Sequence, residues 1–138
     1  MHILITGAAG MIGRKLTERL GREGALAGTP IDKLTLLDVV APAKPEGFKA
    51  KLEIVAADLA VPGEAAKAIA GRPDTIFHLA GVVSGEAEID FEKGYRVNLD
   101  GTRALFEAIR AIGDRLSATP RLHLIHRGVR RALPAVHP

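Results

Sequence analysis

Three glycines near the start of the chain have the spacing of a turn that binds a diphosphate. Gly7, Gly10 and Gly13 lie in GAAGMIG, between an apolar run and a stretch with helical periodicity. Gly7 permits a tight turn because it has no Cβ, and Gly13 lets the helix pack closely on the strand. Gly10 lets the backbone approach a diphosphate, whose charge is met by free N–H groups at the helix start, at Met11 and Ile12. This context favours a dinucleotide-binding site over a purely structural turn.

An acidic side chain is expected beside this turn. Asp38 ends the second apolar stretch, LTLLD. A carboxylate at that position can accept hydrogen bonds from both hydroxyls of an adenosine ribose, and it would repel a 2′-phosphate. Val39 and Val40 follow it without an adjacent arginine, which favours NAD over NADP as the cofactor. The alternative is that Asp38 is a solvated residue at a strand end.

The ends of two further predicted strands are expected to line the same dinucleotide-binding site. Asp58 could accept a hydrogen bond from the adenine amino group, with Leu59 packing on the ring. Asp58 could equally cap the next helix, and its position in the sequence leaves both roles open. Leu79, Ala80 and Gly81 end the following strand. Small residues there would let the backbone lie against the cofactor.

The remaining polar groups are interpreted as structural. His78 is expected to be a packed strand residue rather than a catalyst. The alternating acids of the next segment are expected to form a solvated helix face rather than an acid–base pair. They are Glu86, Glu88, Asp90 and Glu92. His123 and His126 have a spacing compatible with two metal ligands on a helix, but no third ligand is near in the sequence, so no metal site is predicted.

The elements that would position these residues alternate between strands and helices. Strands are expected at 2–6, 34–40, 52–56, 74–80 and 122–125, and helices at 11–22, 62–70 and 84–112. Such alternation predicts a parallel sheet covered on both faces, with right-handed crossovers. The predicted fold class is therefore α/β, a Rossmann-like doubly wound sheet.

Composition narrows the possible classes of protein. The 138 residues are 47% hydrophobic, enough to bury a core, and form one small domain or part of a larger one. The lack of cysteine excludes disulfides and thiolate catalysis. No apolar run is long enough to span a membrane and none resembles a signal peptide, so a cytoplasmic location without a membrane partner is the default.

The net charge of +3 arises in the tail, residues 122–138, which holds three arginines and no acidic residue. Basic tails can bind nucleic acid. Three arginines without interleaved aromatic residues are a weak footprint, however, and no nucleic-acid partner is predicted.

The motifs together resemble those of the extended short-chain dehydrogenases/reductases, the NAD-dependent epimerase/dehydratase family. The resemblance rests on GAAGMIG (7–13), LLD (36–38), DL (58–59), HLAG (78–81) and NLDGT (98–102), and covers residues 1–121. Residues 82–110 are most similar to the D-erythronate dehydrogenase branch, which oxidises the C2 hydroxyl of a small sugar acid.

This resemblance implies roles for particular residues. NAD would be the cofactor, and Asp58 and Leu59 would contact its adenine. Asn98 would be the family's structural and proton-relay asparagine. The substrate would lie near a short segment consisting of Ser84, Gly85 and Glu86.

The chain departs from the family after Arg121. In the family an apolar run ending in Ser-Ser follows, and then Tyr-x-x-x-Lys; these motifs supply the catalytic serine, tyrosine and lysine. Here no serine follows Ser117, and Tyr95 has Leu99 four positions later. No catalytic residue is therefore predicted, and we expect this chain to lack the family's activity.

A frameshift near Arg121 is our hypothesis for this departure. Codons for residues 122–134, read one nucleotide later, can encode a run with two adjacent serines that resembles the family's continuation. The expected organisation is an incomplete NAD(P)-binding Rossmann domain over 1–121 and an aberrant basic tail over 122–138. The family is usually homodimeric, but a dimer is not predicted here because one dimer helix has no counterpart. The alternatives are a nucleotide-sugar epimerase or dehydratase fragment and a non-enzymatic NAD-binding or interaction module.

Overall fold

Five parallel strands form the central sheet of the computed structural model, which describes residues 1–82, 84–113 and 121–124. The strands are β1 (His2–Thr6), β4 (Lys33–Asp38), β5 (Lys51–Ala56), β6 (Thr75–His78) and β7 (Arg121–Leu124). Their order across the sheet is β5-β4-β1-β6-β7, and every neighbouring pair is parallel. The strand order reverses direction at β1, so the segments that follow β1 and β6 lead to opposite faces of the sheet. Ligands of such sheets bind in the crevice between these segments, at the carboxyl ends of the strands. The prediction of a doubly wound α/β fold is confirmed.

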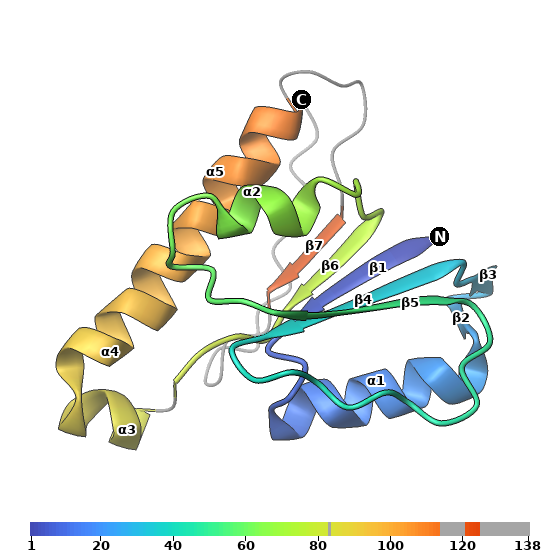
Figure 1. The fold of residues 1–138 in the computed structure, drawn as a ribbon, viewed down its shortest axis with the longest axis horizontal. Helices are drawn as coiled ribbons and strands as arrows, with labels where there is room; N and C mark the ends of the chain where they lie inside the picture. Colours follow the sequence, from blue (N-terminus) through green and yellow to red (C-terminus); the bar gives the residue numbers. More distant parts are fainter. Residues whose placement is uncertain (83, 114–120, 125–138) are drawn as a thin grey trace.

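Helices cover both faces of this sheet. The helix α1 (Met11–Glu23) lies on one face, and α2 (Glu64–Ile69) and α5 (Thr102–Gly113) lie on the other (Figure 1). The buried residues of α1 recur on one side of the helix, at Gly13, Thr17, Leu20 and Gly21. The helix ends at Gly24, which has φ +65° and donates its N–H to the Leu20 carbonyl oxygen at 2.8 Å.

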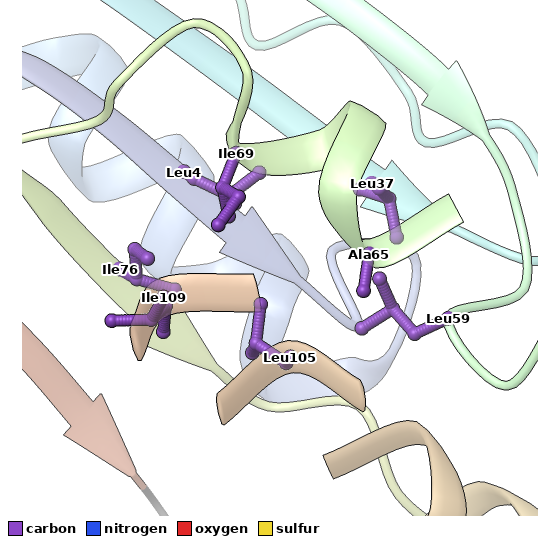
Figure 2. Close-up of a cluster of buried hydrophobic side chains, with 8 residues drawn as sticks. All are labelled: Leu4, Leu37, Leu59, Ala65, Ile69, Ile76, Leu105 and Ile109. Carbon is purple, nitrogen blue, oxygen red and sulfur yellow. The ribbon is translucent and has the colours of Figure 1, made fainter. Parts of the chain in front are cut away.

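The core consists of two apolar clusters, one on each face of the sheet. Ile3 and Ile5 of β1 point toward α1, and Leu4 between them points toward α2 and α5, because successive side chains of a strand alternate in direction. Burial on both faces explains why β1 is a continuous apolar run. Figure 2 shows the cluster under α2 and α5, which comprises Leu4, Leu37, Leu59, Ala65, Ile69, Ile76, Leu105 and Ile109.

The prediction of one continuous helix over 84–112 is wrong. The structure divides it into α3 (Ser84–Ile89), α4 (Phe91–Tyr95), the π-helix η1 (Arg96–Gly101) and α5. The first division falls at Asp90, whose carboxylate accepts a hydrogen bond from the Lys93 backbone N–H at 3.0 Å and so begins a new helix. The widened turns of η1 precede α5.

Smaller differences concern where elements begin and end. The helix α2 begins at Glu64 rather than Pro62, because Gly63 has φ +87° and lies outside the helical region. The strand β4 ends at Asp38, and the exposed residues Val39 and Val40 lie beyond it. A short antiparallel hairpin, β2 (Ala25–Leu26) and β3 (Thr29–Pro30), was not expected.

Within the described residues, no helix has the length and apolar character that a membrane span requires. In the same part of the chain, no three His, Asp or Glu side chains are grouped so that they could hold a metal ion. The side chains of His123 and His126 lie outside the description.

Candidate functional site

The glycine turn joins β1 to α1 at the reversal point of the sheet. Gly7 has φ +73°, and a Cβ there would lie 2.5 Å from the backbone nitrogen of Ala80 and the carbonyl carbon of Leu79. A Cβ on Gly13 would lie 2.1 Å from the carbonyl oxygen of Gly7. The turn therefore packs directly on the segment after β6 and on the first turn of α1, and both contacts exclude any larger residue.

Gly10 differs from the other two glycines because a Cβ there would make one tight contact and no collision. A Cβ there would meet only the carbonyl oxygen of Gly7, at 3.3 Å. Gly10 is the N-cap of α1, no side chain caps the helix, and the first turn holds no acidic residue. Since the first N–H groups of a helix lack partners within it and carry partial positive charge, this end of α1 can receive an anion. Met11 and Ile12 lie there with exposed side chains.

Asp38 lies beside this helix end and is held by the turn. Its Oδ2 accepts a hydrogen bond from the Ala9 N–H at 2.9 Å, and its Oδ1 accepts one from the Val39 N–H at 2.7 Å. An ionised carboxylate has about four acceptor sites, so each oxygen can still accept a further hydrogen bond. Asp38 is therefore an oriented carboxylate next to the anion-receiving end of α1, rather than a freely solvated strand end.

Asp58 follows β5 and turns the chain toward α2. Its Oδ1 accepts a hydrogen bond from the Ala60 N–H at 2.9 Å, and its Oδ2 is paired with the guanidinium of Arg96. Because α2 begins six residues later, at Glu64, Asp58 does not cap that helix. The side chain of Leu59 is buried in the core under α2 and α5, so any contact of Leu59 with a ligand at this edge would come from its backbone.

Asn98 of η1 holds the segment that follows β6. Its Oδ1 accepts a hydrogen bond from the Val82 N–H at 2.9 Å, and its Nδ2 donates to the Val82 carbonyl oxygen at 3.1 Å. A Cβ on Gly81 would lie 3.2 Å from the same Oδ1. Asn98 thus fixes the backbone that leaves the reversal point of the sheet, which agrees with the structural role expected for it. The proton-relay role stays a prediction.

His78 is buried between two threonines at the end of β6. Its Nδ1 lies 2.6 Å from the hydroxyl of Thr6, and its Nε2 lies 2.9 Å from the hydroxyl of Thr102. The residue is 2% exposed, and this burial lowers the pKa of its imidazole to about 4. The interpretation of His78 as a packed strand residue is confirmed. Its two hydroxyl partners come from β1 and α5, and no signal in the sequence indicated them.

The segment expected near the substrate begins α3. This helix packs against α4 in the helical arm that leaves the sheet (Figure 1). The carboxylate of Glu86 is paired with Lys93, and Gly85 has open space around it. For Ser84 only the backbone is described. The described residues do not bring these three next to the glycine turn, so their substrate role stays a prediction.

The fold and the site define a class of protein: a Rossmann-type domain with an anion-receiving turn and a carboxylate beside it. Residues 3–126 match the model of the NAD dependent epimerase/dehydratase family. The chain belongs to this family, as the sequence motifs predicted.

Several named proteins and solved structures are similar to the chain. D-erythronate dehydrogenase of Cupriavidus necator is 48% identical over 118 residues, which cover 82% of this chain and 36% of that protein. The crystal structure of a nucleoside-diphosphate-sugar epimerase from Agrobacterium tumefaciens has a TM-score of 0.86 and 57% identity, covering 90% of this chain and 36% of that one. A variant of uronate dehydrogenase from the same organism, solved with NAD, has a TM-score of 0.67 and 33% identity, covering 89% and 39% of the two chains. The chain therefore spans a little over a third of the length of these relatives.

Proposed function

We propose that this chain forms the NAD-binding part of an oxidoreductase that acts on a small sugar acid. The proposal rests on two groups that lie side by side. One is the N-terminus of α1, which no side chain caps, and the other is the Asp38 carboxylate, which the Ala9 N–H orients. A diphosphate and a ribose are linked in NAD, and this arrangement presents partial positive charge to the first and hydrogen-bond acceptors to the second.

The adenine, the adenosine ribose and the diphosphate of NAD each have residues of this chain to hold them. The diphosphate lies over Gly10 and meets the backbone N–H groups of Met11 and Ile12. The adenosine ribose donates to Asp38, and the adenine amino group donates to Asp58. The backbone of Leu79, Ala80 and Gly81 lies along the cofactor, because the glycine turn packs on this segment.

The cofactor is NAD rather than NADP. A 2′-phosphate would bring negative charge against the carboxylate of Asp38, whose oxygens are held in place by two backbone N–H groups. Neither Val39 nor Val40 can offset that charge. When bound, NAD supplies the hydride acceptor. The residues described here bind and orient it, and we assign none of them as catalytic.

The substrate class follows from similarity. The 48% identity to D-erythronate dehydrogenase supports a small sugar acid, oxidised at its C2 hydroxyl, with Ser84, Gly85 and Glu86 near it. The 57% identity to a nucleoside-diphosphate-sugar epimerase supports a nucleotide sugar as the second candidate. Titration of the NAD-loaded chain with D-erythronate and with a nucleoside-diphosphate sugar separates the two candidates.

Cofactor binding is tested by calorimetric titration of the chain with NAD and NADP. We expect NAD to bind more tightly. Asp38→Asn should weaken NAD binding by about ten- to hundredfold, since hydrogen bonds to charged groups contribute about 1.5–3 kcal/mol, and should reduce the preference for NAD over NADP. Glu88→Gln, on the exposed side of α3, is the matched control and should change neither affinity. Folded chain that binds no NAD, or an unchanged preference in Asp38→Asn, would contradict the proposal.

A further inference from the structure

The π-helix η1 connects two loops at the carboxyl edge of the sheet. Its first residue, Arg96, is paired with Asp58 in the loop after β5. Two residues later, Asn98 is hydrogen-bonded to both backbone groups of Val82, in the segment after β6. Segments of π-helix are rare and are frequently found at functional sites. The family resemblance implies a structural role for Asn98, but it implies no role for Arg96.

The contact between η1 and the loop after β5 involves backbone as well as charge. A Cβ on Gly101, at the last position of η1, would lie 3.6 Å from the Ala60 nitrogen and 3.7 Å from the Leu59 Cβ. The loop is therefore packed against one end of η1 and ion-paired with the other end. The packing of Gly101 on this loop holds η1 in a position from which the Arg96 guanidinium reaches Asp58.

The two oxygens of Asp58 have different partners. Oδ1 accepts from the Ala60 N–H, and Oδ2 is held by Arg96. The side chains of Arg96 and Asp58 are 51% and 23% exposed, so the carboxylate remains open to a ligand. The last torsion of an aspartate is soft, and a second partner on Oδ2 restricts its rotation. Lone pairs remain on both oxygens.

We propose that Arg96 is a positioning residue for adenine, holding the Asp58 carboxylate in the orientation that accepts a hydrogen bond from the 6-amino group of the base. This inference rests on the proposed function, in which Asp58 receives the adenine. It adds a residue that sets the preference for adenine over a base with a 6-oxo group. A 6-oxo group would meet the carboxylate oxygen as acceptor against acceptor, so it gains nothing from the orientation that Arg96 maintains.

The test compares NAD with nicotinamide hypoxanthine dinucleotide, which differs from NAD only in carrying a 6-oxo group and a ring N–H in place of the amino-substituted ring. Both are titrated calorimetrically into the wild-type chain and into Arg96→Gln. We expect Arg96→Gln to weaken NAD binding about three- to fivefold, the scale of a partly exposed ion pair. The affinity for the hypoxanthine analogue should stay within about twofold, and this also reports that the variant is folded.

Two further variants complete the design. Arg103→Gln breaks another exposed arginine–carboxylate pair, with Glu107 on α5, and should leave both affinities unchanged. Arg96→Lys keeps the charge and should restore most of the preference for NAD. An equal loss for both dinucleotides in Arg96→Gln would indicate a general structural role and overturn the inference. So would unchanged affinities, or tighter NAD binding, which would mean that Arg96 competes with the base.

Asp58→Asn separates this inference from the proposed function. Its amide can donate to a 6-oxo group, so the preference for NAD should fall or reverse. If Asp58→Asn changes the preference but Arg96→Gln does not, the inference fails and the proposed function stands. If the wild-type chain binds neither dinucleotide, both fail.

Discussion

At the scale of single residues, the three glycines of the turn have similar spacing but different surroundings. A Cβ would collide with backbone at Gly7 and Gly13, and at Gly10 it would meet only one atom, at 3.3 Å. Packing therefore requires glycine at Gly7 and Gly13, and the role proposed for Gly10 is to let a diphosphate approach the turn. The motif in the sequence predicted this division, and the structure supplies the backbone contacts that require glycine at Gly7 and Gly13.

Alanine substitutions separate the two roles. Gly13→Ala places its methyl group 2.1 Å from the Gly7 carbonyl oxygen, and we expect it to lower the free energy of unfolding by about 1–3 kcal/mol, as overpacking does. Gly10→Ala should change that free energy by less than about 1 kcal/mol, because its backbone has φ −69°, which alanine adopts, and its Cβ would make a single tight contact, at 3.3 Å. It should instead weaken NAD binding. Urea denaturation and calorimetry measure the two quantities, and equal destabilisation by both substitutions would refute this assignment.

At the scale of elements, α5 is amphipathic, and its buried side closes one face of the sheet. Leu105 and Ile109 belong to the core cluster that includes Leu4 and Ile76 of the strands (Figure 2). Phe106, one position after Leu105, is 40% exposed. A larger apolar residue therefore contributes less to the core than its smaller neighbour, because the helix turns it away from the sheet.

Truncating the smaller residue, Leu105, should destabilise the fold more than truncating the larger one, Phe106. Leu105→Ala should lower the free energy of unfolding by about 2–5 kcal/mol, because it leaves a cavity between α5 and the sheet. Phe106→Ala should lower it by less than about 1 kcal/mol. Chemical denaturation of the two variants against the wild-type chain measures both values. A larger loss for Phe106→Ala would mean that α5 is rotated relative to the sheet.

At the scale of the whole molecule, His78 links three elements. Its ring lies between Thr6 of β1 and Thr102 of α5, and it belongs to β6 itself. The two hydroxyls satisfy both ring nitrogens without a charge, so the folded state holds a neutral imidazole that water does not reach. Protonation would place an uncompensated charge in the interior, which is costly.

This arrangement predicts a pH dependence of stability. The folded pKa of His78 is about 4 and its ordinary value is 6.5, so below pH 6.5 the unfolded chain binds a proton that the folded chain does not. The stabilisation is complete above pH 6.5 and is lost as the pH falls toward 4. It amounts to about 3 kcal/mol, at about 1.4 kcal/mol per pKa unit. Unfolding free energies of the wild-type chain and His78→Gln, measured from pH 7 to 4, should converge. A constant difference between them would contradict the assignment.

The sequence by itself determined the five strands of the central sheet, the glycine turn and the position of Asp38. These features depend on local physics. Burial on both faces makes a strand such as His2–Thr6 continuously apolar, and a turn with φ near +73° at Gly7 requires glycine. Asp38 could be placed because it ends such a strand next to the strand that carries the turn.

Only the tertiary structure decided which polar groups meet. Arg96 and Asp58 are 38 residues apart, His78 and Thr102 are 24 apart, and Asn98 and Val82 are 16 apart. No periodicity in the sequence encodes these pairs, because they form when the sheet brings the ends of different strands and η1 together. The same holds for the interruption of the expected helix over 84–112, where a cap at Asp90 and the turns of η1 override the helical periodicity. Contacts between distant elements depend on how the elements are packed, and the sequence pattern within each element does not contain that information.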